Sequence, residues 1–135
     1  MKSGKNKDLT NGPNVAITSV SFSKSAVLRK ELESVFPNAC FNEHGRNLSE
    51  SELVEILRKA DAAIVGTEPI TEKILTQAPK LKIIAKYGVG LDSIDQESLK
   101  RRKIFLGWTG GVNRRSVSEL TMCFMLGLCR NVFGS

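Results

Sequence analysis

Short apolar runs alternate with amphipathic stretches along most of the chain. From Val15 onward, five runs have the length and the apolar character of buried strands, and stretches with helical spacing of apolar residues lie between them. The runs cover residues 15–18, 39–41, 62–65, 81–85 and 104–106. Strands that alternate with helices form a parallel sheet with right-handed crossovers and helices on both faces. We therefore expect an α/β fold built on a doubly wound five-stranded parallel sheet.

The stretches between the runs carry helix signals. The first helix is expected to open near Ser23 and to end before Pro37. Its apolar face would consist of Leu28, Leu32, Val35 and Phe36. Ser49 and Glu52 have the spacing of a capping box at the start of the next helix, and another helix is expected over residues 93–102. Short helices between five short strands favour the flavodoxin-like form of the fold.

A last helix is predicted to begin at Ser116. Ser116 and Glu119 have the spacing of a second capping box. The helix is apolar on nearly every side, and its apolar residues are Val117, Leu120, Met122, Cys123, Phe124, Met125, Leu126, Leu128 and Cys129. One face of a sheet cannot cover such a helix. We therefore expect it to pack against a second domain or another subunit.

The composition is that of one globular domain. The chain has 135 residues, 41% of them hydrophobic and 25% charged, which is enough for a core without metals or disulfides. Its three cysteines are odd in number and form no CxxC pair, which argues against a disulfide framework or a zinc site and favours a cytoplasmic location. Residues 1–13 are polar and are expected to be a disordered lead rather than a signal peptide. No apolar run has the length of a membrane span.

The excess of basic residues does not indicate a nucleic-acid partner. The 20 Lys and Arg against 14 Asp and Glu give a formal net charge of +6, which could attract phosphate. The charges are scattered, however, and the densest cluster, at residues 100–103, lies where a helix is expected to end and complements its dipole. Aromatic residues do not interleave with the basic ones. Neither nucleic acid nor a membrane is expected as a partner.

Three segments follow the predicted strands at the edge where ligands of open α/β sheets bind: residues 66–69, 87–90 and 108–113. Gly88 and Gly90 begin like a dinucleotide-binding GxGxxG motif. Ser93 stands at the position of the third glycine, however, and no acidic residue follows about 20 positions later. The exposed N–H groups of this loop, with the start of the following helix, could instead hold a carboxylate or a phosphate. The alternative is that the glycines only permit a tight turn.

Three segments in this order also resemble motifs of one enzyme family. Residues 63–71 (AIVGTEPIT), 81–95 (LKIIAKYGVGLDSID) and 113–121 (NRRSVSELT) are similar to successive motifs of the D-isomer-specific 2-hydroxyacid dehydrogenases, above all the phosphoglycerate dehydrogenase branch. The resemblance implies an oxidoreductase that uses NAD and acts on a small 2-hydroxy or 2-keto acid. It also implies that the backbone N–H groups of two loop residues bind the substrate carboxylate, namely those of Val89 and Gly90. The residues that it places at the substrate are Gly66, Thr67, Lys86, Tyr87, Gly88, Val89, Gly90 and Asn113.

The resemblance further implies that most of the catalytic machinery lies outside this chain. In the family, the GxGxxG motif, a substrate-orienting Arg and a Glu-His pair belong to a nucleotide-binding Rossmann domain, which would follow Ser135. We therefore expect no catalytic, cofactor-binding or metal-binding residue here and no activity of this chain alone. Residues 14–112 would be the substrate-binding domain. Residues 113–135 would be a linker and a helix that reaches the missing NAD-binding domain, with a homodimer formed through residues 116–133.

Other polar residues near the expected site allow two interpretations. The branch often has an Arg-Ser pair that meets the substrate's phosphate, whereas Gly66 and Thr67 stand here, which argues against phosphoglycerate as the substrate. Glu68, Asp92 and Asp95 are candidate acids by location, but the two aspartates are better explained as residues that start a helix. Trp108 either lines the cleft or the interdomain surface, or packs in the core. The only histidine, His44, matches no catalytic position of the family and is expected in a solvated loop.

Two other functions remain open at this point. The parent protein could be a non-catalytic, corepressor-like member of the family that senses NAD and binds protein partners. The chain could also be an independent module that binds a small ligand. An independent module would be a stable monomer, whereas the apolar surface from Met122 to Phe133 predicts self-association.

Overall fold

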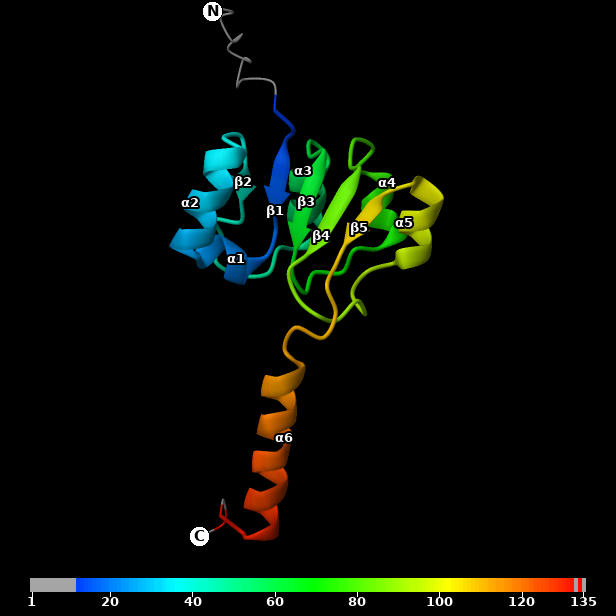
Figure 1. Ribbon diagram of the computed structural model, residues 1–135. Coiled ribbons are helices and arrows are strands. Elements are labelled where there is room, and N and C mark those ends of the chain that lie inside the picture. Colours follow the sequence, from blue (N-terminus) through cyan, green and yellow to red (C-terminus); the bar gives the residue numbers. More distant parts are fainter. Residues whose placement is uncertain (1–11, 133, 135) are drawn as a thin grey trace, which may run out of the picture.

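The computed structural model describes residues 12–132 and residue 134, and it contains one five-stranded sheet (Figure 1). All strand pairs are parallel, in the order β2-β1-β3-β4-β5. The strands are β1 (Val15–Ile17), β2 (Cys40–Phe41), β3 (Ala62–Val65), β4 (Ile83–Lys86) and β5 (Phe105–Gly107). This order confirms the flavodoxin-like prediction, and every strand lies close to its predicted position.

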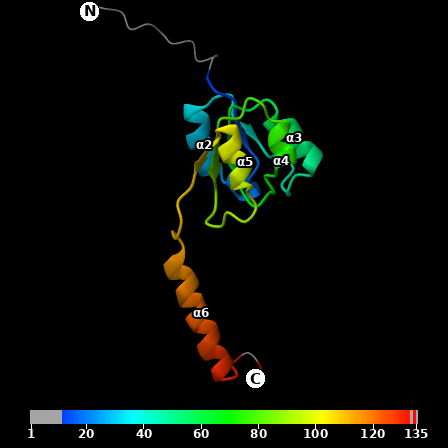
Figure 2. The same cartoon turned by 90° about the vertical axis from the view of Figure 1, so that its right-hand side faces the viewer.

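Helices cover both faces of the sheet (Figures 1 and 2). The covering helices are α1 (Val20–Lys24) and α2 (Ala26–Val35) on one face and α3 (Glu50–Leu57), α4 (Glu72–Thr76) and α5 (Gln96–Arg102) on the other. A further helix, α6 (Arg114–Cys129), follows β5. Because side chains alternate across a strand, Ala63 and Val65 face the core under α3, α4 and α5, whereas Ala62 and Ile64 face the smaller core under α1 and α2. The doubly wound arrangement that the sequence predicts is therefore present.

The face under α1 and α2 is only partly covered. On β4 and β5, Ile83 is 44% exposed and Phe105 is 76% exposed, and the two residues are direct neighbours in the sheet. A hollow of about 650 Å³ lies on the same face, between α2 and the strands β3 and β4. The inner strands of a parallel sheet are normally buried on both faces. This bare apolar face therefore suits a covering element that residues 12–132 do not provide.

Helix α6 extends away from the sheet (Figures 1 and 2). Its large apolar side chains, from Val117 to Leu128, are between 50% and 71% exposed. The predicted helix of nearly uniform apolar character therefore exists, and the rest of the described chain does not bury it. The division of the chain at residue 113 stays a prediction, and residues 1–11 of the expected lead lie outside the described residues.

The helix expected from Ser23 to Phe36 is interrupted, which corrects the sequence prediction. Ser25 has an extended backbone (φ −82°, ψ 107°) that ends α1, and its hydroxyl accepts the Leu28 N–H at 3.4 Å, which caps α2. Val35 was expected on the apolar face but is 66% exposed. The break rotates α2 so that the other three apolar residues, Leu28, Leu32 and Phe36, pack against the sheet.

Of the two predicted capping boxes, the first is confirmed and the second is wrong. Ser49 and Glu52 exchange both bonds, with the Glu52 N–H 3.4 Å from Ser49 Oγ and the Ser49 N–H 2.8 Å from Glu52 Oε2. Helix α6 begins at Arg114 rather than at Ser116. Because of this earlier start, Ser116 lies inside the first turn, and Glu119 pairs with Arg115 at 2.8 Å instead of closing a capping box.

Three further properties concern possible spans, metals and thiols. No helix among the described residues is long and apolar enough to cross a membrane. Within the same residues, no group of His, Cys, Asp and Glu side chains is placed to hold a metal ion. All three cysteines are exposed free thiols.

Candidate functional site

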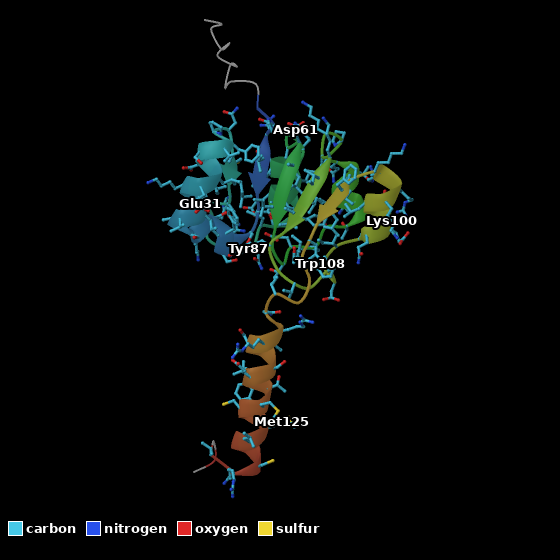
Figure 3. All side chains as sticks on the ribbon, in the orientation of Figure 1. Glu31, Asp61, Tyr87, Lys100, Trp108 and Met125 are labelled. Atoms are coloured by element: carbon cyan, nitrogen blue, oxygen red, sulfur yellow. The ribbon has the colours of Figure 1, made fainter. Side chains whose placement is uncertain are left out.

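The carboxyl ends of the parallel strands meet at one edge of the sheet, the edge from which α6 departs (Figure 1). The loops after β3, β4 and β5 lie at this edge, and Figure 3 shows Tyr87 and Trp108 there, between the sheet and α6. This is where an open α/β sheet binds its ligands.

A hollow of about 240 Å³ lies between the loops after β3 and β4. It is lined by Gly66, Thr67, Lys86, Tyr87, Gly88, Val89, Gly90, Asp92 and Ser93. The structure thus brings together seven of the eight residues that the sequence places at the substrate. The eighth, Asn113, is exposed at the start of α6 and does not line the hollow.

The backbone amides of Val89 and Gly90 are available in this hollow. Within the described part of the chain, no hydrogen bond uses the N–H group of either residue. Gly90 is exposed and Val89 is half-buried. Two adjacent amides without internal acceptors are suited to donate hydrogen bonds to an oxyanion.

The glycine at position 88 gives the loop its shape. Gly88 has φ +149°, a conformation that side chains with a Cβ rarely adopt. Helix α5 begins only at Gln96, where the Asp95 carboxylate caps it by accepting the Ser98 N–H at 3.0 Å. The expected helix start at Ser93 is therefore wrong, because a turn separates the glycine loop from the helix. The hollow therefore contains the amides of the glycine loop, but the positive end of a helix does not reach it as the sequence predicted.

The two charged side chains that line the hollow oppose each other in sign. The Lys86 ammonium donates to the Gly66 carbonyl and, at 3.1 Å, to Ser93 Oγ. Asp92 lies next to the loop, since a Cβ on Gly90 would be 3.2 Å from Asp92 Oδ2. An anion in the hollow would therefore be held by the amides more than by a net positive charge.

Aromatic side chains support the loop from two directions. The Trp108 indole N–H donates to the Val89 carbonyl at 3.0 Å. Tyr87 packs edge-on against Phe22 of α1, with ring centroids 5.3 Å apart. Trp108 is 45% exposed, so the structure favours a place beside the loop over packing in the core.

Sequence reasoning named Glu68 as a candidate acid by its location but missed its burial and its bond to Gly66. Its side chain is only 2% exposed, and its Oε2 atom accepts the Gly66 N–H at 2.6 Å. The sequence shows an acid shortly after a strand but gives no sign of its burial, because neighbours distant in sequence cause that burial.

The other candidate residues lie elsewhere. His44 belongs to the loop after β2, and its Nδ1 atom is 3.8 Å from Glu52 Oε1 on the surface. A hollow of about 530 Å³ that includes His44 shares no residue with the hollow beside Gly88. His44 is thus in the polar loop that the sequence predicts, away from the glycine loop.

The glycine loop does not fit a dinucleotide. Ser93 occupies the place of the third glycine, and its hydroxyl and carbonyl are bonded to Lys86 and Ile70. The loop also leads into a turn and not directly into a helix, so it lacks the helix start on which a pyrophosphate rests. This loop therefore does not form a cradle for NAD.

The fold is of the flavodoxin-like α/β class, with a hollow and two amides without internal acceptors at the carboxyl edge of its sheet. Comparison with known proteins then gives the family. The sequence matches the model of the D-isomer specific 2-hydroxyacid dehydrogenase catalytic domain over residues 15–130, so the chain belongs to this family.

Curated relatives are similar over part of the chain. A glyoxylate reductase of Thermococcus litoralis is 37% identical over 81 residues, which are 59% of this chain and 24% of that protein. A D-3-phosphoglycerate dehydrogenase of Methanocaldococcus jannaschii is 38% identical over 87 residues, which are 63% of this chain and 16% of that protein. The chain thus matches a quarter or less of the length of these relatives.

Solved structures show the same fold. A 3-phosphoglycerate dehydrogenase of Entamoeba histolytica with bound NAD+ superposes with a TM-score of 0.74 and is 26% identical. The match covers 91% of this chain and 41% of that chain. An acyclic imino acid reductase in complex with NADPH and D-Arg reaches a TM-score of 0.75 at 20% identity, which shows the fold alone.

Proposed function

We propose that this chain is the substrate-binding part of an NAD-dependent D-2-hydroxyacid dehydrogenase. In this proposal, the N–H groups of Val89 and Gly90 hold the carboxylate of the substrate. The observation that carries the proposal is that both amides lie without internal acceptors in a hollow at the carboxyl edge of the sheet. Family membership supplies the class of reaction, the oxidation of a D-2-hydroxy acid or the reduction of the 2-keto acid.

The contribution of this chain to the reaction is binding and orientation. Two N–H groups that point at one carboxylate form charge-assisted hydrogen bonds and fix the direction of the bond between the carboxyl group and C2. The Trp108 bond to the Val89 carbonyl restrains the same peptide plane whose N–H belongs to Gly90. The loop is therefore held in place before the substrate arrives, which lowers the entropy cost of binding.

A small substrate without phosphate fits the hollow best. The hollow has a volume of about 240 Å³. Lys86 is the cation among the described residues that line the hollow, and its ammonium is already bonded to Gly66 and Ser93. Relatives of this chain are named glyoxylate reductase and hydroxypyruvate reductase as well as D-3-phosphoglycerate dehydrogenase. Because no free cation lines the hollow within the described residues, we favour the small keto acids over phosphoglycerate.

The cofactor and the subunit contacts belong to the proposal as well. NAD would be bound by a further domain of the parent protein, since the glycine loop of this chain does not form a dinucleotide cradle. The segment from Asn113 onward would lead to that domain, and residues 116–133 would form a homodimer contact; residue 133 lies outside the described residues. The exposed apolar side chains of α6 support this contact.

The only tryptophan of the chain gives a direct test. Trp108 is bonded to Val89, so a ligand on the neighbouring amides should change its fluorescence. Titration with pyruvate or glyoxylate should give a saturable change, and pyruvamide, which lacks the carboxylate, should give none. Equal responses to pyruvate and pyruvamide, or no saturable response to either acid, would refute the proposed function.

A further inference from the structure

We propose that Glu68 is a positioning residue, which fixes the loop formed by residues 87–92 without touching the substrate. We call residues 87–92 the cradle loop. The inference rests on the proposed function, because it concerns the geometry of the amides that would bind the carboxylate. Glu68 does not line the hollow beside the cradle loop; it lines an adjoining hollow that shares Gly66, Thr67 and Tyr87 with it. Because Glu68 is only 2% exposed, its effect on binding is expected to pass through the residues that it contacts.

The two ends of the cradle loop are tied to each other and to the loop after β3. Lys86 stands before the cradle loop, and its ammonium donates both to the Gly66 carbonyl and, at 3.1 Å, to Ser93 Oγ just after the loop. One cation thereby joins three backbone segments. The direction of the Gly66 carbonyl determines where this ammonium lies.

A second set of bonds fixes the far end of the cradle loop. The Ile70 N–H donates to the Ser93 carbonyl at 2.7 Å, and the Asp95 N–H donates to the Ile70 carbonyl at 2.9 Å. Residues 66–70 therefore hold the cradle loop at both ends, through Gly66 at one end and Ile70 at the other. Any change in the shape of residues 66–70 would move the amides of Val89 and Gly90.

Glu68 determines the shape of residues 66–70. Its buried Oε2 atom accepts the Gly66 N–H at 2.6 Å, which curls the segment onto its own side chain. Its Oε1 atom is buried and has no hydrogen-bond partner among the described residues. A buried carboxylate is costly unless its bonds repay the desolvation, so the single bond to Gly66 is the role that the structure gives to this side chain.

The packing around Gly66 leaves little freedom for another arrangement. A Cβ on Gly66 would lie 3.1 Å from Ser19 Oγ and 3.2 Å from Glu68 Oε2. The Gly66 backbone is thus pressed between a buried serine and the buried carboxylate. Removal of the acceptor at Glu68 leaves the Gly66 N–H buried without a partner. The carbonyl of the same peptide, that of Val65, accepts the Tyr87 N–H at 2.8 Å, so a shift of this peptide acts directly on the first residue of the cradle loop.

Two matched variants test this role. Glu68→Gln and Glu68→Met both remove the charge at nearly constant side-chain length, but only glutamine keeps an oxygen for the Gly66 N–H. In amide NMR spectra of the ligand-free chain, Glu68→Gln should leave the signals of residues 87–93 close to their wild-type positions, and Glu68→Met should displace them. Pyruvate affinity should stay within about twofold in Glu68→Gln and fall about tenfold in Glu68→Met, the loss expected for one hydrogen bond.

The outcomes separate the inference from the proposed function. If Glu68→Met binds pyruvate as the wild type does, or if Glu68→Gln weakens binding as much as Glu68→Met, Glu68 does not act through the Gly66 bond. If the wild type binds no acid, the proposed function fails, yet the ligand-free spectra still decide whether Glu68 sets the loop. Should Glu68→Met not fold, hydrogen exchange in the wild type decides, because a Gly66 N–H that exchanges as fast as an exposed amide contradicts the inference.

Discussion

At the scale of single residues, the conformation of Gly88 predicts that a substitution there weakens ligand binding. Its φ of +149° suits glycine almost exclusively, so Gly88→Ala should cost about 1–3 kcal/mol of local strain or force the loop to rearrange. Either result misdirects the amides of Val89 and Gly90. We expect pyruvate affinity, measured by Trp108 fluorescence, to fall about tenfold or more while the sheet stays folded.

Gly107→Ala is the matched control for this variant. A Cβ on Gly107 would meet its nearest neighbours at 3.7 Å or beyond, which is ordinary packing, and Gly107 is not among the positive-φ residues of the described chain. Its pyruvate affinity should equal that of the wild type. A Gly88→Ala variant with wild-type affinity would show that the loop conformation is not what presents the amides.

Residue types predicted the cradle loop but not the contacts that hold it. Gly88 and Gly90 after a strand indicate exposed amides because only a turn rich in glycine leaves N–H groups unpaired there. The bonds from Glu68 to Gly66 and from Trp108 to Val89 depend on which side chains tertiary packing buries, and no local pattern encodes that. The role of Asn113 stays a prediction.

At the scale of elements, α4 and α5 are joined by an ionic cluster around Glu72. Arg102 donates to Glu72 Oε1 at 2.5 Å and Arg101 donates to Oε2 at 3.0 Å. The hydrogen bond from Arg102, with a further bond from Arg101, lowers the pKa of Glu72 from 4.5 to about 2. Because the folded-state pKa lies below the ordinary value, the cluster stabilises the fold fully above pH 4.5 and loses this effect as the pH falls toward 2.

Glu72→Gln should therefore make thermal stability less sensitive to acid. Above pH 4.5 the variant should have a lower Tm than the wild type, and the difference between them should vanish as the pH approaches 2. Glu97→Gln is the control, since Glu97 pairs with Lys100 in an exposed position, and its Tm should follow the wild type at every pH. A constant difference between Glu72→Gln and the wild type across this range would contradict the assignment.

Strand positions were easier to predict than helix ends, and the reason is physical. Parallel strands are mostly apolar, so the runs at residues 62–65 and 81–85 indicate strands although Lys82 interrupts the second run. A helix end depends on which of several capping side chains is used. Ser25 interrupts the first expected helix, and α6 starts before Ser116, although both stretches have helical periodicity.

At the scale of the whole molecule, the exposed apolar helix predicts self-association. Leu120 and Leu128 of α6 are 54% and 71% exposed, and burial of such side chains between copies releases ordered water. The chain should form dimers or larger species in light scattering. The double variant Leu120→Glu with Leu128→Glu should be monomeric, because four charges would meet in a dimer contact.

Val27→Glu tests whether a charge at any exposed apolar residue would prevent self-association. Val27 is 67% exposed on α2, so its substitution should leave association unchanged. Association that survives both charges on α6 but disappears with Val27→Glu would place the contact elsewhere. The bare sheet face beside Ile83 is another exposed apolar surface of the described chain that such a result would make a candidate contact.

The central claim is that the amides of Val89 and Gly90 bind a carboxylate, and amide NMR of the uniformly labelled chain tests it most directly. With increasing pyruvate, both amide protons should move downfield along saturable curves with one common affinity, while pyruvamide leaves them in place. If neither signal moves, or if the saturable shifts fall on other loops, the hollow at the end of β4 is not a carboxylate site.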